Sequence, residues 1–313
     1  MFTARYFLQA CFACTMLIAS AQAGENGLRI GIEAEPLRVK VGEIVKFSAL
    51  NRTGNVRQLK SISWDFNSLD RVEEDASGQM VSHVFNRTGA YSVRLTAVDE
   101  KGRRDEAFCD IEVFPETTAG PSITSNFEGG KTGLFFDSPE TFAFRLEWGN
   151  QFYFRLDNCR DQEISLRIAG YGTGRKQLPS VTPYANDDTF DDDYTLMYST
   201  DYQKHDWQPY RDAEYVYDDA SATLTAVFTP EADSIYFAWS VPWTMRNLRG
   251  LIDRWEGNAN FTWKVIGDSV EGRPIIALTV TDFSQNNQGK KAVWVTGTQH
   301  AYEMAAGPVI EGM

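Results

Sequence analysis

Apolar and polar residues alternate along much of this chain, and this period-two pattern is the feature that most constrains its fold. Alternation of this kind places one face of a β-strand against a core and turns the other face toward solvent. Between residues 28 and 114 it recurs in short segments separated by Gly, Asn and Asp turns, at 28–32, 44–47, 62–64, 81–85 and 91–98. Strands of this length and spacing predict an all-β sandwich of the immunoglobulin type.

A second alternating region follows a linker. Residues 116–122 contain Thr, Gly and Pro and are predicted to be that linker. Residues 123–240 then alternate at 142–148, 151–156, 164–168, 223–228 and 235–239. Aromatic side chains are dense in these segments, which suits either a carbohydrate-binding surface or a sandwich core. Because each alternation buries one face of a strand, we favour the core and expect a second β-sandwich.

The periodicity changes after residue 240. Residues 245–255 carry apolar side chains at a helical spacing, namely Leu248, Leu251, Ile252 and Trp255. Strands are predicted at 261–266, 275–281 and 292–296, and a further helix at 305–313. This mixture of helices and strands predicts an incomplete α/β domain over residues 241–313, whose sheet has too few strands to stand alone.

The first 23 residues have the features of a secretory signal peptide. Arg5 precedes an apolar stretch over residues 7–19, and Ala21-Gln-Ala23 supplies the small residues of a cleavage site. The apolar stretch is shorter than a membrane span requires, and an uncleaved N-terminal anchor is the alternative. We therefore expect a secreted, periplasmic or cell-surface protein, with no membrane span once residues 1–23 are removed.

The net charge limits the class of partner that the chain can bind, and the cysteines limit the disulfides that it can form. The chain has 43 Asp and Glu residues against 30 Lys and Arg, a net charge of −13, which argues against nucleic acid as a partner. Cys11 and Cys14 lie in the expected signal peptide, so Cys109 and Cys159 would remain in the exported protein. Two outcomes are open for this pair: a disulfide that crosses the boundary between the two sandwiches, or two buried thiols.

His300 and Glu303 are the candidate metal ligands. They lie three residues apart where an apolar strand is predicted to give way to a helix, and residues at this spacing share one face of a helical turn. An imidazole and a carboxylate so placed can bind one zinc ion, and catalytic zinc sites commonly take two His and one Glu. Spacing assigns no third ligand, because His205 has no partner near it in the sequence. The structural alternative is a polar pair that caps the last helix.

Two other patterns indicate chemistry only weakly. The acidic run 186–193 has the oxygens that calcium prefers, but an EF-hand loop started within it would place Asp192 and Tyr198 where Gly and Glu are needed. A solvated acidic loop is therefore the preferred interpretation. Ser269 and Ser284 have no His in a nucleophile arrangement, so serine hydrolysis has little support.

Motifs in the first alternating region carry a resemblance to a known family. They occur in the order Trp64-Asp-Phe66, His83-Val-Phe85 and Thr88-Gly-Ala-Tyr91 with the strand that follows it. With them, residues 24–115 resemble a PKD (polycystic kidney disease) domain. The resemblance implies that Trp64 and Tyr91 fill the core and that His83 is a structural strand residue. PKD domains usually act as spacers or adhesive modules, which implies contact with a protein or glycan at the cell surface.

Three ordered motifs near the end of the chain carry a second resemblance. An aromatic-Pro entry to a helix lies at 237–243, the run Ile-Gly-Asp-Ser-Val-Glu-Gly-Arg-Pro-Ile at 266–275, and Gln-His-Ala-Tyr-Glu at 299–303. In this order they resemble the zinc metallocarboxypeptidases of the carboxypeptidase A-like family. Residues 123–240 resemble the β-sandwich that precedes the catalytic domain in the cytosolic-carboxypeptidase subfamily. The resemblance implies a zinc cofactor bound by His300 and Glu303, and hydrolysis of C-terminal residues of peptides or proteins by a zinc-activated water.

The resemblance also implies parts that have no counterpart in this sequence. In the family the third zinc ligand, the catalytic Glu and the carboxylate-binding Arg follow the point that corresponds to Met313. Arg246, Arg249, Arg254 and Arg273 occupy no motif position for the last role. We therefore expect the N-terminal portion of an exported carboxypeptidase, inactive by itself, and a truncated gene product and a natural relic are both open. The alternative is a non-catalytic secreted or cell-surface binding protein built on the two sandwiches.

Overall fold

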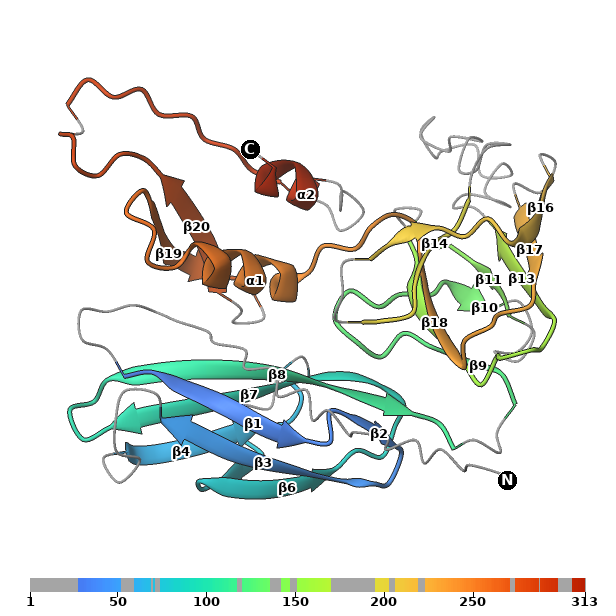
Figure 1. Ribbon diagram of the computed structural model, residues 1–313, viewed down its shortest axis with the longest axis horizontal. Coiled ribbons are helices and arrows are strands. Elements are labelled where there is room, and N and C mark those ends of the chain that lie inside the picture. Colours follow the sequence, from blue (N-terminus) through green and yellow to red (C-terminus); the bar gives the residue numbers. More distant parts are fainter. Residues whose placement is uncertain are drawn as a thin grey trace, which may run out of the picture.

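The computed structural model of the protein describes residues 28–51, 59–68, 70, 74–116, 120–135, 142–146, 151–169, 195–202, 206–218, 223–270, 274–286, 288–297 and 306–312. Figure 1 shows its three parts. A long β-sandwich runs from blue to green, a second β-sandwich is coloured green to light orange, and a C-terminal group of helices and a hairpin is orange to red.

The first sandwich consists of two sheets. Strands of the smaller sheet follow the order β1-β3-β6, with bounds Ile30–Glu35 (β1), Ile44–Asn51 (β3) and Met80–Val84 (β6). Strands of the larger sheet follow the order β2-β8-β7-β4-β5, with bounds Arg38–Lys40 (β2), Arg104–Phe114 (β8), Gly89–Asp99 (β7), Leu59–Asp65 (β4) and Ala76–Ser77 (β5). The sheets share one apolar core, so a β-sandwich is present here as predicted.

Trp64 lies within this core and has no exposed surface. Its indole N–H donates to the carbonyl of Gly78 at 2.8 Å, and its ring centroid lies 5.7 Å from that of Phe47. Tyr91 is also buried and donates its hydroxyl to the carbonyl of Arg87 at 2.8 Å. The core positions predicted for Trp64 and Tyr91 are therefore confirmed.

The second sandwich also has two sheets in the described residues. One follows the order β10-β11-β13-β17-β16, with bounds Leu134–Phe135 (β10), Ala143–Arg145 (β11), Ile164–Ala169 (β13), Thr223–Phe228 (β17) and Ala213–Asp218 (β16). The other follows the order β15-β14-β18-β12-β9, with bounds Gln208–Pro209 (β15), Met197–Ser199 (β14), Ser234–Ala238 (β18), Tyr153–Asp157 (β12) and Ser122–Thr124 (β9). Strand β11 runs parallel to β13, whereas β13 and β17 are antiparallel.

Aromatic side chains fill the core of the second sandwich. Phe144, Phe154 and Phe237 have no exposed surface. The ring centroid of Phe154 lies 5.6 Å from that of Phe144 and 5.8 Å from that of Phe237. The aromatic density of these segments therefore serves packing, as the alternation predicted.

The C-terminal group combines two helices and a hairpin, with bounds Met245–Trp255 (α1), Phe261–Asp268 (β19), Pro274–Val280 (β20) and Ala306–Glu311 (α2). Helix α1 has the bounds that the sequence predicted. It begins where the N–H of Thr244 donates to Oδ1 of Asn247 at 2.7 Å, one half of a capping box. Leu251 and Ile252 are buried, whereas Trp255 is 45% exposed, so the apolar face of α1 is covered only in part.

The strand predicted at residues 292–296 is wrong, because the structure has no strand there. Val293 and Trp294 are 86% and 74% exposed. A strand pairs its N–H and C=O groups with a neighbouring strand, and no sheet of the described residues includes this segment. The predicted α/β sheet is thus represented in the described part by the β19–β20 hairpin, and the helix predicted at 305–313 is the shorter α2.

No helix among the described residues has the length and apolar character that a membrane crossing requires. The signal peptide expected at residues 1–23 lies outside the described residues and stays a prediction. Residues 117–119 of the expected linker also lie outside them.

Cys109 and Cys159 are separate thiols, and both are buried. Of the two outcomes that the sequence left open, the structure therefore has the buried thiols rather than the disulfide. Burial, with the Asp157 carboxylate nearby, raises the pKa of the Cys159 thiol to about 12, and burial raises the pKa of Cys109 as well. Both groups are protonated at neutral pH and are poor nucleophiles, because the thiolate is the reactive form.

Candidate metal centre

The two candidate zinc ligands, His300 and Glu303, belong to residues 298–305, which lie outside the described residues. Both ends of that segment are described. A Cβ atom built on Gly297 would lie 2.9 Å from Cβ of Ala306 and 2.8 Å from Cδ1 of Ile310. Residue 297 therefore contacts α2 directly, and the segment that carries both candidate ligands begins and ends at the same place.

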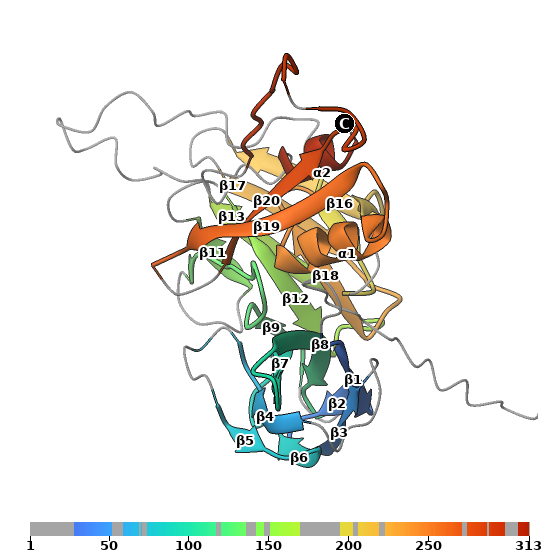
Figure 2. The same cartoon turned by 90° about the vertical axis from the view of Figure 1, so that its left-hand side faces the viewer.

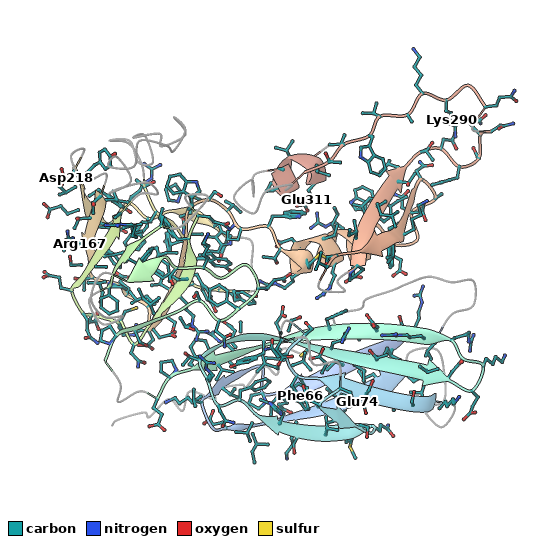
Figure 3. All side chains as sticks on the ribbon, turned by 180° about the vertical axis from the view of Figure 1, so that it is seen from behind. Phe66, Glu74, Arg167, Asp218, Lys290 and Glu311 are labelled. Carbon is teal, nitrogen blue, oxygen red and sulfur yellow. The ribbon has the colours of Figure 1, made fainter. Side chains whose placement is uncertain are left out.

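Helix α2 is held against the rest of the C-terminal group at two points. Gly307 is buried against the indole of Trp243, where an added Cβ would lie 2.1 Å from the ring atom Cγ. Arg254 of α1 pairs with Glu311 of α2, which is labelled in Figure 3, with 2.6 Å between Nη1 and Oε1. These contacts fix the position at which the chain leaves the candidate ligand segment.

Gly307→Ala is expected to loosen α2 from Trp243, because its methyl group cannot occupy space that the indole already fills. Overpacking of this kind costs about 1–3 kcal/mol. Hydrogen–deuterium exchange followed by mass spectrometry should show the amides of residues 306–312 exchanging on the order of tenfold faster. Gly312→Ala is the matched control, because its added Cβ would make only an ordinary contact, 3.5 Å from the Pro308 carbonyl. Equal exchange in both variants would contradict this packing.

His83 has the structural role that the sequence predicted. It lies in β6 with its ring stacked on Phe66 at 4.0 Å and against the edge of Phe85 at 4.7 Å. Burial lowers the pKa of the imidazole, which keeps it neutral near pH 7. The other two sites weighed from sequence, His205 and the acidic run 186–193, lie outside the described residues.

No group of three or more His, Cys, Asp or Glu side chains that could hold a metal is present in the described part of the chain. Ser284 donates its hydroxyl to the Asp282 carboxylate at 2.6 Å on an exposed loop. The chemistry expected of the C-terminal group therefore rests on His300 and Glu303.

The arginines of α1 serve packing between parts of the chain. Arg246 pairs with Asp110 of β8, with 3.4 Å between Nε and Oδ2. Arg249 places its guanidinium 3.5 Å from the ring centroid of Phe108, also in β8. Arg273 lies outside the described residues.

Sequence reasoning missed a buried charged cluster at the boundary between the two sandwiches. Arg155 has no exposed surface, and Asp157 and Glu112 are nearly as deeply buried. The available signal was an arginine at the end of the aromatic run Phe-Tyr-Phe in a strand predicted to be half-buried. A charge among aromatic core residues indicates a partner from elsewhere in the fold.

Comparison with known families gives two matches. Residues 32–113 match the family model of the PKD domain, and residues 253–310 match the family model of zinc carboxypeptidases. The second match contains both His300 and Glu303. The chain is related to the metallocarboxypeptidases. The PKD match agrees with the resemblance found in residues 24–115.

Several proteins are similar to larger parts of the chain. An uncharacterized protein of Zymomonas mobilis is 26% identical over 200 residues, which are 61% of this chain and 45% of the relative. A metallo-carboxypeptidase of Burkholderia cenocepacia is 27% identical, with a TM-score of 0.45 over 61% of this chain and 47% of the other. A metallo-carboxypeptidase of Pseudomonas aeruginosa is 21% identical, with a TM-score of 0.37 over 50% of this chain and 39% of the other. The chain spans about half the length of the first two relatives.

Proposed function

We propose that this chain is the N-terminal portion of an exported zinc-dependent carboxypeptidase that hydrolyses C-terminal residues of peptides or proteins. The observation that carries the proposal is the match of residues 253–310 to zinc carboxypeptidases, because it includes the imidazole of His300 and the carboxylate of Glu303. In this proposal residues 1–23 are the signal peptide, 24–115 the PKD domain, 116–122 the linker, 123–240 the preceding sandwich of the cytosolic-carboxypeptidase type, and 241–313 the start of the peptidase domain.

The donor set suits zinc. A neutral imidazole nitrogen and a carboxylate oxygen are both common zinc ligands, and two protein ligands leave room for a third and for water. Because residue 297 contacts α2, the described residues on either side of the segment that carries His300 and Glu303 lie next to each other. Bound zinc would activate a water and polarise the scissile carbonyl.

The two proposed ligands, His300 and Glu303, have different roles in zinc binding. His300 must be neutral to bind, which ties zinc affinity to pH and predicts that the affinity falls as acid protonates the imidazole. Glu303 supplies a negative charge that offsets part of the charge of the metal. The third ligand, the catalytic Glu and the carboxylate-binding Arg are assigned to no residue of this sequence, so we propose that the chain alone binds zinc weakly and has no turnover.

Zinc titration by calorimetry, alongside hydrolysis of a blocked dipeptide, tests the proposal. We expect one weakly bound zinc per chain and no hydrolysis. A chain without zinc affinity that binds a cell-surface protein or glycan would support the alternative of a non-catalytic binding protein.

We assign contacts of the PKD domain with a cell-surface protein or glycan to the β1-β3-β6 sheet. In this sheet the side chains of Ile44 and Met80 are 59% and 77% exposed, whereas strand β8 of the other sheet is covered by the rest of the chain.

A further inference from the structure

Strand β8 of the PKD domain is buried on both of its faces, which is unusual for a strand of a small sandwich. Residues 107, 109, 111 and 113 point into the PKD core. The alternate residues Phe108, Asp110, Glu112 and Phe114 share the opposite face, two residues apart. We call these four side chains the outer stripe of β8. Figures 1 and 2 show β8 at the side of the PKD domain that faces α1 and the second sandwich.

Arg155 of the second sandwich binds one end of the outer stripe. Its guanidinium lies 4.2 Å from the ring centroid of Phe114, and Nη2 donates to the carbonyl of Val113 at 2.6 Å. Within its own sandwich it pairs with Asp157, with 2.7 Å between Nε and Oδ1. Because Arg155 has no exposed surface, the PKD domain supplies contacts that water supplies to an exposed arginine.

Glu112 is the next member of the outer stripe and is 2% exposed. Its Oε1 accepts a hydrogen bond from the hydroxyl of Tyr236, a residue of β18, at 2.6 Å. The same oxygen lies 4.0 Å from Nη1 of Arg155, and Oε2 lies 3.3 Å from Nε of Arg38. A buried carboxylate is tolerated only with such partners, and two of the three come from the second sandwich.

The other half of the outer stripe binds α1. Arg246 pairs with Asp110 and also places its guanidinium 3.9 Å from the ring centroid of Tyr202 in the second sandwich. Arg249 lies one turn further along α1 and covers Phe108. The stripe thus has two acids between two aromatic residues. From its start to its end along β8, it contacts first Arg249, then Arg246 and last Arg155.

A backbone contact joins the same two domains beside the stripe. The N–H of Ala90 donates to the carbonyl of Asn126 at 2.9 Å, and Nδ2 of Asn126 donates to the carbonyl of Thr88 at 3.1 Å. A Cβ on Gly89 would lie 2.2 Å from that Asn126 carbonyl, so only glycine permits the approach. The glycine of the PKD motif therefore also serves the domain contact.

We propose that the outer stripe of β8 is an arginine-docking surface, and that through it the PKD domain acts as an internal scaffold that fixes the second sandwich and α1. An independent spacer or adhesive module would have its own solvated surface on this face. Here separation would take Val113 and Phe114 away from Arg155, and would take the hydroxyl of Tyr236 and the guanidinium of Arg155 away from Glu112. The two sandwiches and α1 should therefore unfold together. This inference does not depend on zinc or on peptidase activity.

Thermal unfolding of the whole chain, followed by calorimetry, tests the scaffold. The wild type should show one transition for both sandwiches. Arg155→Met keeps the apolar stem but leaves Glu112 and Asp157 without the guanidinium, so we expect the transition to fall by on the order of 10 °C and to split into two. Arg160→Met is the matched control: Arg160 lies in the same sandwich but is exposed and pairs with Asp233, at 3.0 Å, away from the PKD domain. It should shift the transition by less than about 3 °C.

A gentler pair keeps the test informative if Arg155→Met does not fold. Tyr236→Phe removes the donor of one hydrogen bond across the boundary, and Glu112→Gln removes the charge of its acceptor. Because both substitutions act on the same contact, their effects should not add. The unfolding temperature of the double variant should lie within about 2 °C of that of the less stable single variant. Additive losses, two transitions in the wild type, or equal behaviour of Arg155→Met and Arg160→Met would overturn the scaffold.

Discussion

His300→Ala is expected to lower the affinity of the chain for zinc on the order of 100-fold. Structural zinc sites with four ligands bind with about 10–16 kcal/mol, so each ligand supplies roughly 3 kcal/mol. Removing the imidazole leaves Glu303 as a single carboxylate, which holds zinc no better than other surface acids. With a net charge of −13 the chain has many such acids, and the loss should therefore reach the level of nonspecific binding.

His205→Ala is the matched control for this measurement. It removes an imidazole of the same chemistry from a position for which no ligand partner is predicted. Competition with a zinc-binding dye would measure both variants and the wild type under the same conditions. Wild-type affinity in His300→Ala, or an equal loss in both variants, would show that the zinc ligands have been assigned wrongly.

Trp64→Ala is expected to lower the free energy of unfolding by about 3–5 kcal/mol. The indole is fully buried, and its removal leaves a large cavity beside Phe47. It also deprives the Gly78 carbonyl of its hydrogen bond from the indole N–H. The cavity and the lost hydrogen bond both destabilise the folded state.

Urea unfolding followed by far-UV circular dichroism would measure this change. Trp255→Ala is the control, because that indole is 45% exposed at the end of α1 and should contribute less than about 1 kcal/mol. If Trp64→Ala cost no more than Trp255→Ala, the core position of Trp64 would be wrong. Because the outer stripe of β8 couples the domains, we expect the transition of the second sandwich to move with that of the PKD domain.

Local patterns predicted much of the fold. Period-two alternation identified β3, β7, β13 and β17, because each has one buried face. Helical spacing and the residues before Met245 predicted the bounds of α1. These features depend on neighbours within a few residues, and a sequence contains that information.

Two features depended on distant parts of the chain and were not predicted. Strand β8 carries Asp110 and Glu112 among its buried residues, so its pattern is not that of a half-buried strand until the arginines that pair with them are known. Conversely, Val293 and Trp294 have the composition of a strand but are exposed and belong to no sheet of the described residues. In both cases the partner, rather than the local pattern, decides the structure.

For the candidate site too, the local sequence predicted one part and left another undetermined. Residue type and spacing identified His300 and Glu303, and the family match covers them. Their side-chain geometry lies outside the described residues, so their role as ligands stays a prediction. What the structure adds is the contact of Gly297 with Ala306, which brings together the two ends of their segment.

X-ray absorption at the zinc edge of the zinc-loaded chain examines the ligands themselves. We predict nitrogen and oxygen neighbours at about 2.0–2.1 Å, with imidazole scattering that disappears in His300→Ala and persists in His205→Ala. A sulfur neighbour at about 2.3 Å, or imidazole scattering that survives the loss of His300, would contradict the assignment of this segment as a zinc-peptidase site.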